Sequence, residues 1–178
     1  MSDVGATRKV LYLAEPTFAR QEFSRLYLMV HANIQKVPES ARGVHWRHTA
    51  RSVGSLAFHI AENYEGLGPE VEIFSTNTPH TAATAQKVAE ILRFSHQIES
   101  VLSPLWEGGH NPGGRYLDSD KINTIRESAA CPDTATLVIG QHRVVNEFAH
   151  DQFYIPNYSG IVFVENGQTQ PVAAGYEW

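Results

Sequence analysis

Hydrophobic and polar positions along the chain follow two patterns, and each predicts one kind of element. Short continuous apolar runs are typical of strands buried on both faces of a sheet. These runs lie at residues 9–13, 70–75, 97–101, 136–140, 160–164 and 170–174. Between them, apolar residues recur at steps of three and four, which predicts amphipathic helices at residues 16–35, 49–66, 79–92, 119–130 and from Arg143 onward. The alternation predicts an α/β fold, a three-layer α/β/α sandwich with a mostly parallel central sheet and a C-terminal hairpin.

Local signals mark the ends of several predicted elements. Pro16 and Pro79 each suit the first position of a helix, and Thr78 and Thr49 are placed to cap the third and second helices. Asn166-Gly167, between the last two apolar runs, is a turn signal for the terminal hairpin. The Gly- and Pro-rich residues 102–118 predict a long loop, which in a compact domain is usually functional or mobile.

Length and composition place these elements in one domain. The chain has 178 residues, 42% of them hydrophobic, which is enough to bury a full core without disulfides or a structural metal. We therefore expect a flexible N-terminus at residues 1–8 and a single domain over residues 9–178.

Charge, cysteine content and apolar run lengths exclude several classes of function. The net charge is −5, and the 14 Lys and Arg residues are dispersed, so we expect no nucleic-acid partner. Cys131 is the single cysteine, which excludes an internal disulfide and agrees with a reducing cytoplasm. No apolar run approaches the length of a membrane span, and the N-terminus lacks the apolar segment of a signal peptide. We therefore predict a cytoplasmic protein without a membrane partner.

The residues that follow the first predicted strand are the first candidates for chemistry. Ligands in open α/β sheets bind outside the carboxyl ends of the strands. After Leu13 the chain continues as Ala14-Glu15-Pro16, so Glu15 is the candidate side chain at this edge.

Four local patterns follow one another along the chain in a recognisable order. Leu11-Tyr12-Leu13 leads into Ala14-Glu15-Pro16, and Thr76 to Ala85 opens a helix with Pro79 and His80 in its first turn. Leu105-Trp106-Glu107-Gly108 carries an acid, and Leu137 to His142 is an apolar strand followed by a histidine. Together they resemble the histidine phosphatase superfamily, with its phosphoglycerate mutase-like fold, over nearly the whole chain.

The resemblance implies a set of pocket residues and also shows where they differ. In that superfamily the first strand ends in Arg-His-Gly, whose histidine accepts the phosphoryl group. A later helix opens with Ser-Pro-x-x-Arg-Ala-x-x-Thr-Ala, and an acid and a second histidine complete the pocket. The resemblance places Glu107 and His142 in the last two roles. It places Glu15 where the family has its nucleophile and His80 where the family has its second arginine.

These replacements oppose the family's reaction. Phosphoryl transfer to histidine needs a neutral imidazole and fixed positive charge around the phosphate oxygens. A carboxylate at Glu15 would repel a phosphate, and His80 supplies at most one titratable charge. We therefore expect a catalytically degenerate member without phosphatase or mutase activity, which acts by binding or regulation through the remodelled pocket.

Two alternatives use the same pocket differently. Glu15, His80, Glu107 and His142 form a set of imidazoles and carboxylates that suits a divalent metal, although their spacing matches no compact metal motif and no cofactor is expected. The other alternative is an enzyme of non-phosphatase chemistry, with His80 and Glu107 as an acid–base pair. Arg20, Arg143 or His110 would then contact the ligand. The ligand is a small molecule or a protein, and a homo-oligomer stays open.

The other histidines give weaker signals. His59 lies beside the apolar stripe of the second helix and is expected to pack there. We expect five more to be surface or loop residues, namely His31, His45, His48, His96 and His150.

Overall fold

A computed structural model describes residues 23–34, 37–64, 69–76, 78–104, 119–148 and 157–177. Within them, a six-stranded sheet has the order β3-β2-β4-β1-β5-β6. The strands are β1 (Arg25–Val30), β2 (Glu70–Ser75), β3 (Ser100–Pro104), β4 (Thr134–Gly140), β5 (Ile161–Glu165) and β6 (Gln168–Ala173). The first four strands run parallel, and β5 and β6 add an antiparallel hairpin beside β1.

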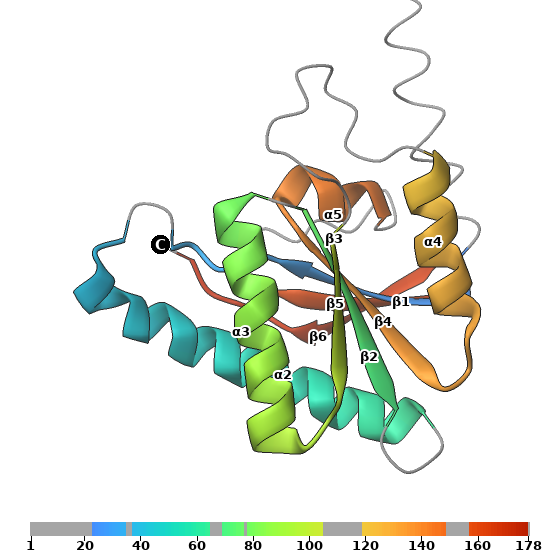
Figure 1. Cartoon of the computed structure of the whole chain (residues 1–178), viewed down its shortest axis with the longest axis horizontal. Coiled ribbons are helices and arrows are strands. Elements are labelled where there is room, and N and C mark those ends of the chain that lie inside the picture. Colours follow the sequence, from blue (N-terminus) through green and yellow to red (C-terminus); the bar gives the residue numbers. More distant parts are fainter. Residues whose placement is uncertain are drawn as a thin grey trace, which may run out of the picture.

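Helices cover both faces of this sheet (Figure 1). They are α2 (Arg42–Asn63), α3 (Pro79–His96), α4 (Ser119–Ala130) and α5 (His142–Phe148), and a short 3-10 turn, η1 (Glu39–Ala41), precedes α2. Apolar residues of α2 and α3 pack on one sheet face, around Tyr27 and Phe163. Those of α4 and α5 pack on the other face, around Leu28 and Val138. The three-layer α/β/α sandwich, its mostly parallel sheet and its C-terminal hairpin are confirmed.

The helix predicted over residues 16–35 is wrong in the part that the structure describes. Residues 25–30 form β1, which pairs in parallel with β4 and antiparallel with β5. Leu26 to Val30 are completely buried because the strand is covered on both faces and both edges. Because every position in such a run is apolar, apolar residues also fall at steps of three and four, and the run has the same spacing as a helix. The strand predicted at residues 9–13 lies outside the described residues.

Smaller corrections concern where other elements begin. The second helix starts at Arg42 rather than near Thr49, which lies inside α2 and does not cap it. The Thr49 hydroxyl donates to the His45 carbonyl oxygen at 3.1 Å and hydrogen-bonds Ser159 Oγ at 2.9 Å. The third strand covers Ser100–Pro104, three residues later than the predicted start. By contrast, β2, α4 and the turn at Asn166-Gly167 match their predictions, and both turn residues have the positive φ that this turn needs.

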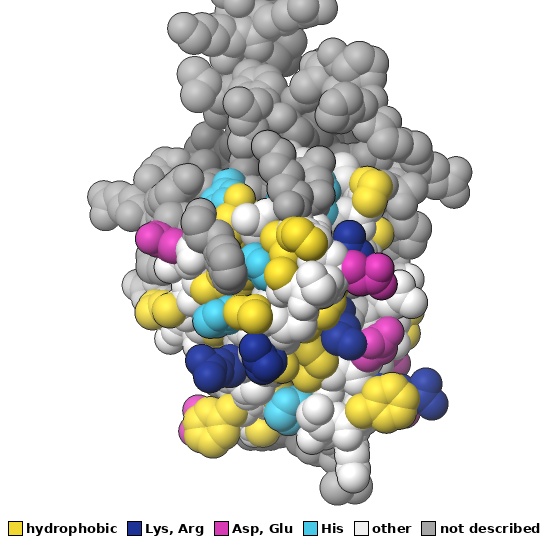
Figure 2. Space-filling view, turned by 90° about the vertical axis from the view of Figure 1, so that its left-hand side faces the viewer, with side chains coloured by type: hydrophobic (Ala, Val, Ile, Leu, Met, Phe, Trp, Pro, Cys, Tyr) yellow, Lys and Arg dark blue, Asp and Glu magenta, His cyan; other side chains and the backbone are white. Residues whose placement is uncertain are grey.

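On the face drawn in Figure 2, the exposed apolar side chains of the described residues do not form one continuous patch. Phe58 on α2 and Phe94 on α3 are 67% and 80% exposed. On the face drawn in Figure 2, the described apolar, basic, acidic and His side chains are interspersed. None of the helices in the described ranges combines the length and the apolar character needed to cross a membrane.

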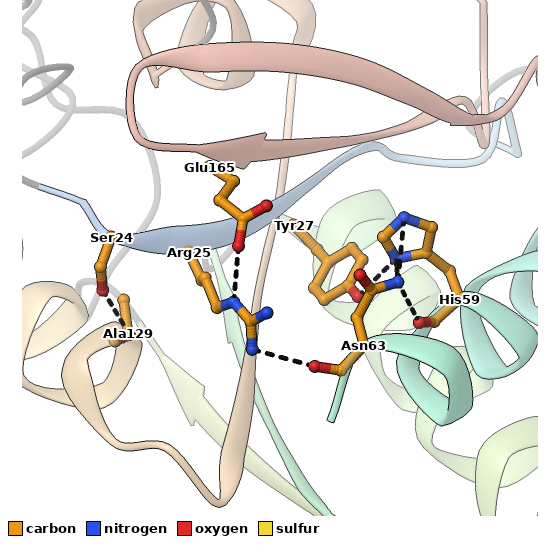
Figure 3. Close-up of polar contacts among 7 residues, drawn as sticks. All are labelled: Ser24, Arg25, Tyr27, His59, Asn63, Ala129 and Glu165. Atoms are coloured by element: carbon orange, nitrogen blue, oxygen red, sulfur yellow. Dashed lines mark hydrogen bonds and ion pairs between the residues drawn. The ribbon is translucent and has the colours of Figure 1, made fainter. Parts of the chain in front are cut away.

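A polar cluster fastens the amino end of β1 to its neighbours (Figure 3). Arg25 Nε donates to Glu165 Oε1 at 2.9 Å, and its Nη1 donates to the Asn63 carbonyl oxygen at 3.0 Å. The buried Tyr27 hydroxyl hydrogen-bonds His59 Nδ1 at 2.7 Å. These contacts join β1, β5 and the end of α2, which fixes the strand that carries the candidate site at its other end.

Candidate imidazole site at the carboxyl edge of the sheet

The site begins where β1 ends. His31 directly follows Val30, and its backbone N–H donates to the Gly140 carbonyl oxygen at the end of β4, at 3.0 Å. On the other side, the Ser159 N–H donates to the Val30 carbonyl oxygen at 2.9 Å. The end of β1 is thus held between β4 and residues 157–160. This places the His31 side chain at the carboxyl edge of the parallel strands, where ligands bind in such sheets.

His31 is buried and has one of its ring nitrogens committed. Its side chain is 8% exposed, and Nδ1 lies 2.8 Å from the Ala32 carbonyl oxygen. A carbonyl oxygen can only accept, so Nδ1 carries the proton and donates it. Burial lowers the pKa of His31 to about 4, and the neighbouring His80 and His142 act in the same direction. At neutral pH the ring is therefore uncharged, with its lone pair on Nε2.

His80 faces His31 from the first turn of α3. The two ring centroids are 4.3 Å apart. The helix begins as predicted, with Thr78 at the N-cap position and Pro79 at the first helical position, but the Thr78 side chain makes no capping hydrogen bond. His80 thus lies in the first turn of the helix that follows β2. Burial lowers the pKa of His80 as well. Its Nε2 lies 3.5 Å from Gln141 Nε2, so the Gln141 amide can donate to the neutral ring.

Tyr158 lies between His31 and His142, the other histidine predicted for the pocket. Its ring centroid lies 5.6 Å from that of His31 and 5.4 Å from that of His142. Its backbone pairs with Tyr176 through two hydrogen bonds of 2.9 Å. The phenol therefore lies between two imidazoles, one from the residue after β1 and one from the first residue of α5.

The C-terminal segment supports this edge through Tyr176. The Tyr176 hydroxyl accepts the Asn33 N–H at 2.9 Å and lies 2.8 Å from Nδ1 of the completely buried His45. Burial raises the pKa of Tyr176 to about 12, so the phenol stays protonated. Residues of α2, the loop after β1 and the C-terminus are thereby tied together beside the site.

The structure brings together some of the predicted site residues. His80 and His142 lie at the same edge, joined through His31 and Tyr158. Arg143 belongs to α5, but its side chain is not described. Four other predicted site residues lie outside the described residues, namely Glu15, Arg20, Glu107 and His110.

His31 and His45 correct the expectation that both are surface or loop residues. Each is buried, and each hydrogen-bonds through Nδ1. The sequence held a signal for His31, because Leu-Tyr-Leu occurs at residues 11–13 and again at 26–28. The second copy lies in β1 and leads to Val30-His31-Ala32, whereas the resemblance described above rests on the first copy, which leads to Glu15.

The described polar groups of this edge can bind a small polar ligand. Among the described side chains, no set of three or more His, Cys, Asp and Glu residues is arranged to hold a metal ion. Two of the four predicted ligands, Glu15 and Glu107, lie outside the described ranges, so the metal hypothesis stays a prediction. The described groups are neutral imidazoles, an amide and a phenol, which can donate to or accept from a small polar ligand.

Comparison with known proteins agrees with the fold. No protein-family model and no curated protein matches the sequence. Among solved structures, the fold is similar to that of SixA from Agrobacterium tumefaciens, a protein assigned as a phosphohistidine phosphatase. The TM-score is 0.50 at 15% sequence identity, and the match covers 84% of this chain and 95% of that chain. The chain thus has a fold like that of a histidine phosphatase, and at this identity the likeness concerns the fold alone.

Proposed function

We propose that this protein is a catalytically degenerate histidine-phosphatase-fold protein that acts by binding or regulation. Its ligand would bind in the imidazole site, which consists of His31, His80, Gln141, His142 and Tyr158. The contact between His31 and His80, with ring centroids 4.3 Å apart, carries the proposal. Both rings have lowered pKa values, so the pair is uncharged near neutral pH. Beside each other, the two rings have an amide and a phenol as described neighbours, Gln141 next to His80 and Tyr158 next to His31.

This arrangement differs from the one that phosphoryl transfer needs. In the Arg-His-Gly pattern of the superfamily, an arginine precedes the histidine, and here the matching residues are Val30-His31-Ala32. Val30 is completely buried in the apolar core and supplies no charge. An apolar side chain in place of this guanidinium leaves the developing charge on a phosphoryl group with less stabilisation. We therefore expect ligand binding without efficient turnover.

One observation favours a second function, a slow phosphoryl transfer at His31. The hydrogen bond from Nδ1 to the Ala32 carbonyl oxygen leaves the lone pair on Nε2, as a nucleophile requires. In that reaction Nε2 would form a bond to phosphorus, the bond from phosphorus to the ester oxygen would break, and the departing oxygen would take up a proton. Water would then release the phosphate from Nε2.

Release of nitrophenol from an aryl phosphate separates the two functions. For the degenerate protein we expect release at the rate of buffer alone, in the wild type and in His31→Asn alike. A rise in the melting temperature with inorganic phosphate in the wild type, but not in His31→Asn, would show the binding half of the proposal. Release above the buffer rate that disappears in His31→Asn or in a His142 variant would instead establish the enzyme.

A further inference from the structure

The described side chains around His80 are titratable or neutral rather than permanently charged. His31 faces it from the end of β1, and Gln141 lies beside it at the end of β4. His142 of α5 and Tyr158 complete this side of the cluster through their contacts with each other and with His31. The described part of the site can therefore acquire positive charge by taking up a proton.

We infer that ligand binding at this site is coupled to proton uptake, so that an oxyanion enters together with one proton, which His80 then carries. The inference rests on the proposed function, because it takes the imidazole site to be where the ligand binds. Beyond the proposed function, it specifies that the ligand is negatively charged and that its affinity depends on pH.

The geometry favours His80 over His31 as the proton carrier. His31 is 8% exposed and has its Nδ1 committed to Ala32, whereas His80 is only half-buried and its Nε2 lies 3.5 Å from Gln141 Nε2. An amide side chain can serve both forms of the ring, because its NH2 group donates to neutral Nε2 and its carbonyl oxygen accepts from protonated Nε2. The change of protonation therefore requires only a rotation of the Gln141 amide.

Two features keep His80 neutral while the site is empty, and an anion reverses both. His80 lies in the first turn of an 18-residue helix, whose N-terminus carries partial positive charge that opposes an imidazolium. Burial of the ring acts in the same direction and lowers its pKa. An oxyanion beside the ring supplies the opposite charge and favours the protonated form. Because the two rings are in contact, a second proton on His31 would be repelled by the first, which limits the uptake to one.

Calorimetric titration with inorganic sulfate tests the inference. Sulfate is a suitable probe because it does not itself titrate near neutral pH. Titrations in two buffers of different ionisation enthalpy give the number of protons taken up, and we expect about one proton per bound sulfate. The affinity should then fall by about tenfold per pH unit above neutrality.

Two variants separate proton coupling from binding. His80→Arg replaces the titratable group with a fixed charge, so it should still bind sulfate but with proton uptake close to zero. His96→Arg, at the exposed end of the same helix, is the matched control and should behave like the wild type. Each variant is compared only if it keeps a cooperative melting transition.

Three results would overturn the inference: sulfate binding to the wild type without proton uptake, uptake that is unchanged in His80→Arg, or the absence of saturable binding. Aryl phosphate turnover by the same preparation would contradict the proposed function but leave the proton coupling standing. The two failures are therefore distinguishable.

Discussion

The Thr84 hydroxyl accepts the backbone N–H of Ala32 at 3.1 Å and donates to the His80 carbonyl oxygen at 2.7 Å. One buried side chain of α3 thus fastens the residue after His31 to the helix turn that carries His80. The distance between the two imidazoles is therefore set by the fold as well as by contact between the rings. This relationship makes the imidazole site testable by a change that touches neither ring.

Replacing Thr84 by Val should loosen this link. The change removes the acceptor of a buried backbone N–H, which typically costs about 1–3 kcal/mol. We expect a loss of that size in the free energy of urea unfolding, together with weaker sulfate binding. Thr124→Val is the matched control, since the exposed Thr124 hydroxyl makes the same kind of bond, to the Asp120 carbonyl oxygen at 2.9 Å. Equal losses in both variants would mean that the link through Thr84 has no special role.

The lowered pKa of His31 predicts a dependence of stability on pH. The pKa is about 4 in the fold and 6.5 in the unfolded chain, so the unfolded chain binds the proton more tightly. The contribution is therefore fully present above pH 6.5 and is lost as the pH falls toward 4. Near the lower end of this window, the wild type should lose about 3 kcal/mol of unfolding free energy through this group.

Urea unfolding across this window checks that value. His31→Asn should show a correspondingly flatter profile, and His96→Asn, a change at the exposed end of α3, should follow the wild type. If His31→Asn and the wild type lose stability in parallel, His31 is not the buried neutral base that the structure indicates.

Gly175 should tolerate no side chain. Its φ is +74°, and a Cβ built there would lie 2.4 Å from the Tyr158 carbonyl oxygen and 2.5 Å from the Gly160 nitrogen. Gly175→Ala should therefore lower the melting temperature sharply and displace Tyr158, weakening sulfate binding. Gly167→Ala shares the positive φ of +77° but has open space around its Cβ, so it should cost only about 1 kcal/mol. Similar melting temperatures for both variants would contradict the close approach at Gly175.

The bond between Tyr27 and His59 should be asymmetric in its energetics (Figure 3). Tyr27 is completely buried and its pKa is raised by burial, whereas His59 is half-buried and can reach water. His59→Leu would leave the buried phenol hydroxyl without its hydrogen-bond partner and should cost about 1–3 kcal/mol. Tyr27→Phe should cost less, about 1 kcal/mol. Denaturant unfolding of both variants checks the order, and a larger loss in Tyr27→Phe would reverse the explanation.

Most of the architecture could be predicted from local signals that act independently of distant residues. Three features could be recognised from their own residues alone: the turn at Asn166-Gly167, the start of α3 at Pro79 and the apolar run of β4. β1 could not be placed in the same way, because a strand buried between two neighbours has no polar side to reveal its periodicity. The choice between two Leu-Tyr-Leu segments therefore depended on pairing with β4 and β5, which is a tertiary property.

Only part of the candidate site could be predicted, because some of its residues depend on contacts between distant segments. His80 and His142 follow recognisable elements and reach the expected edge of the sheet. His31 was missed because its role depends on β1, and with a helix predicted over residues 16–35 it fell near the end of that helix. His45 was missed because its burial depends on Tyr176, a residue more than a hundred positions away in sequence.

The most direct test of the imidazole site is nitrogen-detected NMR of the histidine rings near neutral pH, with and without sulfate. Without sulfate, the proposed site predicts a neutral His31 ring, protonated on Nδ1 and with a free lone pair on Nε2. With sulfate, the His80 ring should change to the doubly protonated form while His31 stays neutral. A charged His31 in the empty protein, or His31 and His80 signals that sulfate leaves unmoved, would contradict the account.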